Sequence, residues 1–283
     1  MQDLPSPLAL AFAEHAVPWL LVFVRVAGIT IFAPMFSGRT LPVRFRVLIA
    51  GMIAAAVYAG LDPAQRAAPP MSVEALPFAL FSEVLIGASI GLIAGLPLVA
   101  VELAGQVIGY QIGFSLAQAA NPELDINLDA IGSLLFYIAL SLFITLDGLE
   151  HTFASLLGTF TGVPLGGLAY SDAPLEVYLS VLMMSTELAM RIAAPVAGVV
   201  LLTLVAIGFV MRTMPQLNVM SVSFPISILV GVSTLVLGLF GVADGMAANL
   251  DESISAISAW AADLAASEGS PAVGSGGEAS DVR

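Results

Sequence analysis

The sequence predicts an all-α, integral membrane-associated protein built from helical hairpins, with about six apolar segments and long, kinked helices. Hydrophobic residues make up 59% of the 283 positions, charged residues make up 10%, and the mean hydropathy is +1.00. A soluble domain carries roughly a quarter charged residues. The apolar runs reach the length of about 20 residues that a bilayer crossing needs. Prolines within or beside these runs are expected to kink or end helices.

The charged residues exclude several functions. The chain has no Lys, and its eight Arg stand against 21 acidic residues, which gives a net charge of −13. Nucleic-acid binding needs clustered basic residues, so we expect none. The absence of Lys also excludes a phosphate-binding loop of the Gly-Lys type. The chain has no Cys, and His15 and His151 lack further ligands at metal-binding spacing, so we expect no metal, no cofactor and no enzymatic activity.

The first apolar run, Ala16 to Phe36, contains Arg25. An arginine at that depth costs about 2.5 kcal/mol or more unless it is paired, so Arg25 should face protein or water rather than lipid. The positive-inside rule places the basic cluster that follows on the cytoplasmic side. That cluster consists of Arg39, Arg44 and Arg46, and a second apolar run, Val47 to Gly60, comes after it. Simple alternation of spans then puts both termini outside.

A third apolar run extends from Leu76 to about Ala104, and glycines recur through and beyond it at four-residue intervals. These glycines are Gly87, Gly91 and Gly95, and then Gly105, Gly109 and Gly113. On a helix this spacing places each set on one face, where other helices can pack closely. Glu83 and Glu102 lie in the same region. We expect both to be buried acids, serving either as a proton relay or as packing and helix-end residues.

A loop is predicted downstream of the glycines. Residues 113–129 begin apolar and end acidic, and Asn121-Pro122 should break any helix there. The next apolar run, Ile131 to Leu146, ends at Asp147, and a turn is expected at Gly162 to Gly167.

The run from Val177 to Met211 carries Glu187 and Arg191 four residues apart, so their side chains can pair on one helix face. A proline just beyond this run should end or kink the helix near Met214. The last apolar run, Ile226 to Val242, then completes a helical hairpin with a polar tip. The tip is formed by Arg212, Pro215, Gln216 and Asn218.

These segments suggest a division of the chain into parts. Residues 1–245 form a polytopic helical domain, 246–266 an amphipathic C-terminal helix, and 267–283 a disordered acidic tail rich in Gly and Ser. The amphipathic helix places four large residues at helical spacing, which is typical of a membrane-interface or partner-docking helix. They are Ile254, Ile257, Trp260 and Leu264.

Several segments, in order from about Val24 to Gly231, resemble the FliR family, the R-type export-gate component of the flagellar type III secretion system. The most specific segment reads Arg-x-x-Pro-Gln-Leu-Asn-Val, from Arg212 to Val219, and is followed by Phe224, Pro225 and Gly231. Similar segments lie at 33–46, 83–87, 104–114 and 162–167. The family is related to the T-type injectisome component, and the absence of Lys favours the flagellar branch.

The resemblance implies a non-enzymatic, structural and gating subunit of a protein export channel, within a helical export-gate assembly. Its partners would be P-type and Q-type subunits (FliP, FliQ), the B-type export switch protein (FlhB), unfolded flagellar export substrates and membrane lipid. Its location would be the bacterial inner membrane at the flagellar basal body. The resemblance also assigns a pore plug, with the candidates Tyr110, Phe114 and Leu116.

The same resemblance assigns subunit assembly to the polar tip and the residues after it, which are Arg212, Pro215, Gln216, Asn218, Phe224, Pro225 and Gly231. The alternative function is a proton-coupled secondary transporter of a small solute, in which Glu83, Glu102 and proline-broken helices would handle protons.

Overall fold

The computed structural model describes residues 7–33, 42–66, 74–113, 130–166, 175–213 and 219–269 of the chain. All regular elements in these ranges are helices, as the sequence predicts. The helices are α1 (Pro7–Phe32), α3 (Val43–Gly60), α4 (Pro63–Arg66), α5 (Leu76–Ile112), α7 (Ala130–Thr145), α8 (Gly148–Gly162), α9 (Leu175–Thr213) and α10 (Val219–Gly269).

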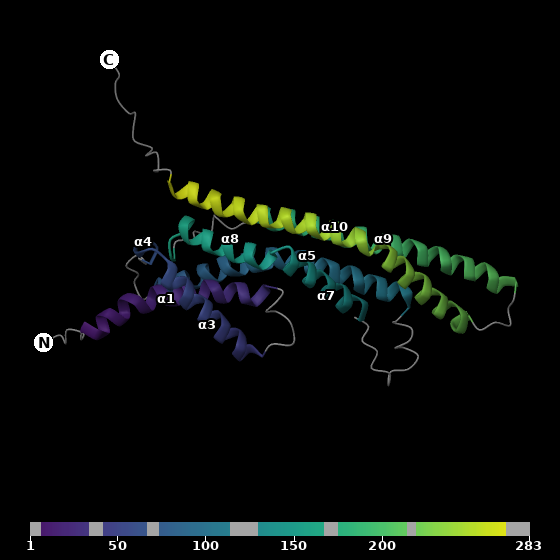
Figure 1. Cartoon of the computed structure of the whole chain (residues 1–283), viewed down its shortest axis with the longest axis horizontal. Coiled ribbons are helices and arrows are strands. Elements are labelled where there is room, and N and C mark those ends of the chain that lie inside the picture. Colours follow the sequence, from purple (N-terminus) through teal and green to yellow (C-terminus); the bar gives the residue numbers. More distant parts are fainter. Residues whose placement is uncertain are drawn as a thin grey trace, which may run out of the picture.

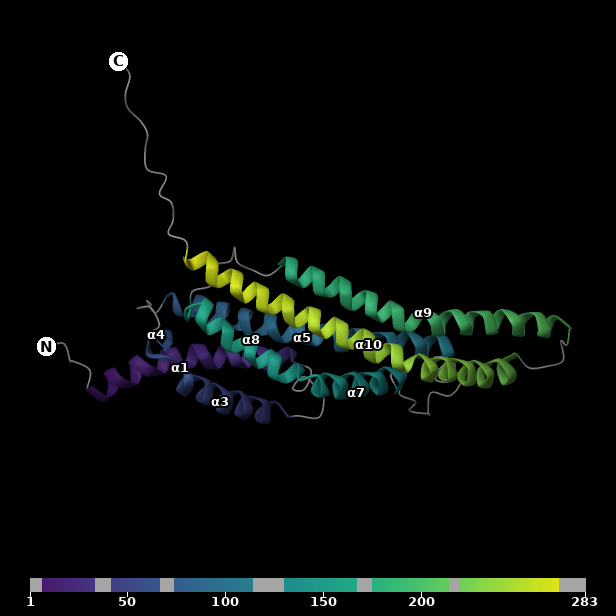
Figure 2. The same ribbon diagram turned by 45° about the horizontal axis from the view of Figure 1, so that its top comes forward.

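The helices form an elongated bundle arranged around α5 (Figures 1 and 2). Helix α1 packs on the first part of α5, α7 packs on its second part, and α9 contacts both parts. Helix α10 runs along α8 and α9. In the 18-residue apolar window of α5, 67% of the residues are buried, the largest share among the candidate spans. The start of α1 and the end of α10 lie at the same end of the molecule (Figure 1).

Five of the described helices are long and apolar enough to cross a membrane. These spans are His15–Phe32 in α1, all of α3, α5 and α9, and Ser221–Leu239 in α10. A sixth is obtained if α7 and α8, which meet at a bend of 63°, are taken as one broken span. The predicted number of about six apolar segments therefore agrees with the structure.

Helix α5 is longer than the apolar run that predicted it. It continues past Ala104 through Ile112, although Pro97 lies inside it. Gly113 ends the helix with a φ of 100°, a left-handed conformation that glycine adopts without steric cost, and its N–H donates to the carbonyls of Gly109 and Tyr110. The predicted loop begins at this cap, and its residues 114–129 lie outside the described part of the chain.

The break predicted at Asp147 separates α7 from α8. Asp147 has a φ of 55°, which few residues other than glycine and Asn or Asp adopt readily. Gly148 follows against the ring of Phe143, where a Cβ would lie 2.6 Å from the ring carbons. Helix α8 ends at Gly162, so the turn predicted from that residue onward begins where expected.

Helices α9 and α10 form the predicted hairpin. Helix α9 ends at Thr213, next to the predicted stop at Met214, and Arg212 lies in its last turn. Residues 214–218, which include most of the polar tip, lie outside the described residues. Helix α10 contains 51 residues and continues without a break across positions 245 and 246. The C-terminal amphipathic segment is therefore the last part of a longer helix.

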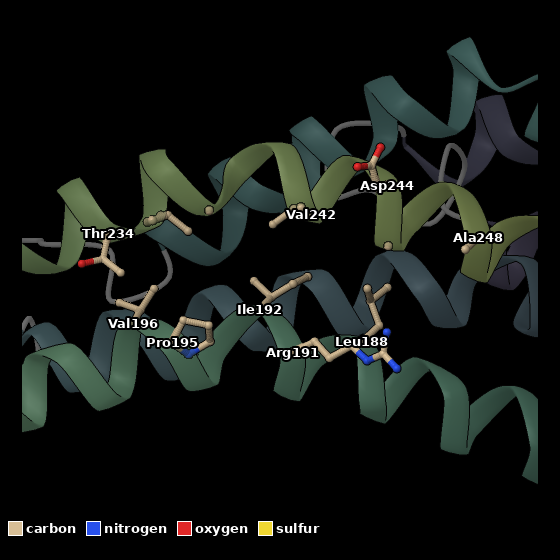
Figure 3. A pocket seen from close by; sticks show the side chains of 13 residues that line it. Leu188, Arg191, Ile192, Pro195, Val196, Thr234, Val242, Asp244 and Ala248 are labelled. Atoms are coloured by element: carbon tan, nitrogen blue, oxygen red, sulfur yellow. The ribbon is translucent and has the colours of Figure 1, made fainter.

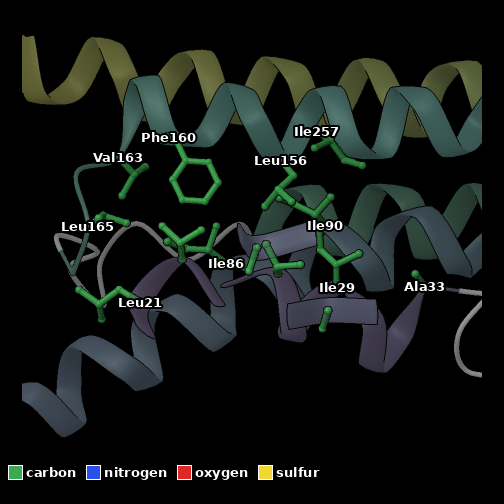
Figure 4. Packing of buried hydrophobic residues seen from close by; sticks show 14 of the residues in the cluster. Leu21, Ile29, Ala33, Ile86, Ile90, Leu156, Phe160, Val163, Leu165 and Ile257 are labelled. Carbon is green, nitrogen blue, oxygen red and sulfur yellow. The ribbon is translucent and has the colours of Figure 1, made fainter. Parts of the chain in front are cut away.

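Two clusters of buried apolar residues form the core. The first joins α1, α3, the first part of α5, α8, the start of α9 and the end of α10, and Figure 4 shows ten of its members with labels. The second joins the later part of α5, α7, α9 and the middle of α10. Ile257 and Trp260 are buried in the first cluster. These two residues of the amphipathic segment thus pack on the chain itself, where the sequence suggested a membrane interface or a partner.

Candidate functional site

A buried ion pair joins α1 to α5. The Nε of Arg25 donates to one carboxylate oxygen of Glu83, and its Nη2 donates to the other at 3.0 Å. Both side chains are fully buried. The prediction that Arg25 faces protein is confirmed, and the structure identifies Glu83, 58 positions away, as its partner. A two-point contact of this kind fixes the relative position of the two side chains.

Further contacts complete the surroundings of this pair. Arg25 also donates to the Thr159 hydroxyl at 3.2 Å and to the Val163 carbonyl at 3.5 Å, and its guanidinium lies 4.3 Å from the centre of the Phe160 ring. The N–H of Gly166 donates to Glu83 at 2.6 Å. We call these six residues the Arg25 centre. It ties α1, α5, the end of α8 and the residues after α8 together, which offsets the cost of burying two charges.

Glu83 and Glu102 occupy different environments. Glu83 is fully buried within the Arg25 centre, whereas Glu102 is only partly buried. They stand 19 positions apart on one continuous helix, a separation of about 28 Å along its axis. The structure therefore does not bring the two acids together as neighbours in a proton relay.

Two glycines of the first set, Gly87 and Gly91, lie at the crossing of α1 and α5. A methyl group on Gly87 would overlap the backbone carbonyl of Arg25, and one on Gly91 would lie 2.7 Å from the carbonyl oxygen of Ile29. Gly28 of α1 makes the reciprocal contact, because its Cβ would lie 2.7 Å from the carbonyl oxygen of Val84. Gly28 was missed in the sequence because it stands alone in an apolar run.

The second set of glycines has different surroundings. A Cβ on Gly105 would lie 2.6 Å from the Cα of Gly132 in α7, so the two backbones approach closely there. Gly109 of this set and Gly95 of the first set are also buried within α5. Gly113 is the left-handed cap of α5, so its backbone conformation accounts for a glycine at this position.

The candidate plug residues lie at and beyond the end of α5. Tyr110, in the last turn of α5, is 57% exposed. Phe114 and Leu116 lie outside the described residues. The structure therefore shows where the segment with Phe114 and Leu116 begins, which is directly after the helix cap at Gly113.

The residues after the polar tip that resemble the FliR family include Gly231, which packs at the C-terminal end of α5. Gly231 of α10 is buried, and a Cβ there would lie 2.5 Å from the Cγ1 of Ile112 and 3.3 Å from a methyl of Val200. Phe224 is partly buried and Pro225 is exposed, both within α10, and Arg212 is exposed at the end of α9. Gly231 thus places α10 directly against the last residue of α5.

A groove separates the middle parts of α9 and α10 (Figure 3). Its volume is about 520 Å³, and apolar residues and glycines make up most of its lining. Arg191 lines the groove and forms the predicted ion pair with Glu187, which lies beside it, at 2.6 Å. Within the described residues there is no group of three or more His, Asp or Glu side chains suited to hold a metal ion.

These features define a polytopic helical membrane protein with a central helix held by a buried ion pair and close backbone contacts. Residues 16–253 match the family described as "Bacterial export proteins, family 1", and the chain belongs to this family. It is a membrane protein of this export family, with the helical fold that the sequence predicts.

Curated relatives are similar over most of the chain. The flagellar biosynthetic protein FliR of Escherichia coli K12 is 30% identical over 235 residues, covering 79% of this chain and 86% of the relative. FliR of Caulobacter vibrioides is 30% identical over 236 residues, covering 83% and 93%. FliR of Bacillus subtilis is 28% identical over 227 residues, covering 77% and 84%.

Proposed function

We propose that the chain is a structural and gating subunit of the flagellar type III protein export channel. Its membership of the bacterial export family, together with its similarity to flagellar FliR proteins over most of its length, supports a role as a subunit of the flagellar type III export apparatus. This family match is the observation that carries the proposal. We further propose that the role is not enzymatic.

In this proposal the helices form a frame, and the segment after α5 closes the pore. The Arg25 centre and the glycine contacts hold α1 and α5 at a fixed distance. The chain then leaves α5 through Gly113 into the segment that contains Phe114 and Leu116, with Tyr110 exposed just before it. Apolar side chains gathered at a narrow point can close a pore by excluding water.

The proposed partners are the P-type and Q-type subunits, FliP and FliQ, and the export switch protein FlhB. Unfolded flagellar subunits would pass through the shared channel, and membrane lipid would contact the exposed apolar helices. The proposed location is the bacterial inner membrane at the flagellar basal body. We assign subunit assembly to the polar tip and the residues after it, because Arg212 is exposed there and available to a neighbouring chain.

The alternative of a proton-coupled transporter has no support. Glu83 is held by an arginine, a backbone N–H and a closed core, and Glu102 lies far along the same helix. Releasing the Glu83 carboxylate would leave Arg25 buried without its partner, which is strongly destabilising.

The function is tested by deleting the gene in its native host and restoring it with a tagged copy. We expect the deletion to abolish swimming and secretion of flagellar subunits while leaving growth unchanged, and we expect the tagged chain to purify within a large membrane complex that contains FliP and FliQ. Recovery of the chain only as an isolated species that transports a small solute in liposomes would overturn the proposal.

A further inference from the structure

The groove between α9 and α10 has a polar end with a buried, unpartnered acceptor. Asn249 is 8% exposed, and its side-chain oxygen has no hydrogen-bond partner in the described structure. The residue lines a smaller cavity of about 130 Å³ together with Glu187 and Glu252, and this cavity adjoins the groove because both are lined by Arg191, Gly245 and Ala248. A buried amide oxygen without a partner carries a cost of about 1–3 kcal/mol, so this position favours an occupant that supplies a donor.

The rest of the groove suits a close-packed helix. Gly238 and Gly241 of α10 line it, and a Cβ at either position would meet nothing within 4 Å. Ala248 is a further small residue of α10 that lines the groove. Ile192 and Val196 of α9 line the opposite side and point toward α10 (Figure 3). Small residues on an open helix face let the backbone of another helix approach closely.

The charges beside the polar end favour a basic occupant. Glu187 is already paired with Arg191, whereas neither Asp244 nor Glu252 has an ion-pair partner among the described residues. This end lies beyond the apolar window of α10, which stops at Leu239. The acceptor and both acids would repel the phosphate of an anionic lipid and attract an ammonium or guanidinium group.

We propose that this groove docks an apolar helix of another export-apparatus subunit that carries a Lys or Arg at the end facing Asn249. The inference rests on the proposed function for the existence of such a neighbour. The helix packs over Gly238 and Gly241, and its basic side chain lies against Asn249 beside Glu252 and Asp244. The chain contains no Lys itself.

The helix that occupies the groove can be identified by cross-linking from one introduced cysteine. The chain has no Cys of its own, so a thiol-specific label reacts only at the introduced position. The Ala248→Cys variant is labelled with a maleimide benzophenone in membranes that contain the whole apparatus, and the photoproducts are mapped by mass spectrometry. The expected product joins position 248 to an apolar protein segment with a Lys or Arg within two helical turns. A lipid adduct, a segment without a basic residue, or the absence of a protein adduct each overturns the proposal.

A matched pair of glycine variants tests whether the groove contributes to assembly. Gly241→Leu fills the groove, while Gly198→Leu adds the same side chain to α9 at a position that also has no neighbour within 4 Å but does not line the groove. We expect Gly241→Leu to lower co-purification of the cross-linked subunit by about tenfold or more, and Gly198→Leu to leave it unchanged at equal membrane levels of the chain. Equal recovery with both variants overturns the groove proposal.

Two further results separate this inference from the proposed function. A charge exchange, Glu252→Lys combined with an acidic replacement of the mapped basic residue, should restore recovery that each single change lowers. If the unaltered tagged chain recovers no export subunit at all, the proposed function itself fails. If it recovers the complex and the charge exchange restores nothing, only the groove assignment fails.

Discussion

Arg25 and Glu83 form a buried ion pair that joins α1 to α5, and neither side chain is exposed. The pair is surrounded by donors and acceptors from the end of α8 and the residues that follow it. An ion pair with complete hydrogen bonding has one favourable geometry. The pair therefore determines the relative positions of α1, α5 and the end of α8 as well as the stability of their packing.

Replacing Glu83 with Leu should be strongly destabilising, because it leaves a charged Arg25 buried without its partner. We expect a loss of about 3–5 kcal/mol, seen as a lower unfolding temperature in detergent and a lower level of the chain in membranes. The double variant Arg25→Met with Glu83→Leu removes both charges and should recover part of this loss. An unchanged unfolding temperature in the single variant would contradict the role given to the ion pair.

Adding a methyl group at Gly87 should push α1 away from α5. The Cβ would overlap the backbone of Arg25, which cannot move like a flexible side chain, so we expect Gly87→Ala to cost about 1–3 kcal/mol. The control is Gly158→Ala in α8, where nothing lies within 4 Å of the new Cβ. That change should be neutral or stabilise the helix by up to about 1 kcal/mol. Equal unfolding temperatures for both variants would refute the close-contact argument.

Deleting residues 114–119 should make the gate leaky, because this segment contains the candidate plug residues Phe114 and Leu116. The measurement is ion conductance of membranes in which the whole gate is expressed. Deletion of an equal number of residues from the acidic tail, 270–275, serves as the control and should leave conductance unchanged. Normal ion tightness after removal of 114–119 would exclude the plug assignment.

Truncation after residue 245 should prevent stable folding, although the sequence suggests a boundary there. The removed part contains Met246 and Leu250 of one core cluster and Ile257 and Trp260 of the other. Loss of a single buried large side chain costs about 2–5 kcal/mol, so loss of all four exceeds the stability of a typical domain. Truncation after residue 269 keeps all of α10 and should preserve membrane level and motility.

Apolar periodicity and proline placement predicted most of the fold. Some features depend only on residues that are close in sequence, so they could be predicted from the sequence alone. They are the ends of α3 and α9, the break at Asp147 and the pairing of Glu187 with Arg191. The full length of α5 was harder to predict because its end depends on a cap at Gly113, and glycine also occurs throughout the helix. The unbroken passage of α10 across position 245 depends on both core clusters that it packs against.

The sequence by itself determined that this is a helical membrane protein of an export family. The hydropathy pattern and the ordered segments that resemble the family can both be recognised without a structure. Only the tertiary structure decided which groups meet. It paired Arg25 with Glu83, set Gly28 opposite Gly87, placed Gly231 against Ile112, and turned Trp260 toward the chain's own core. These contacts join residues far apart in sequence, and their positions follow from how whole helices cross, which local patterns do not encode.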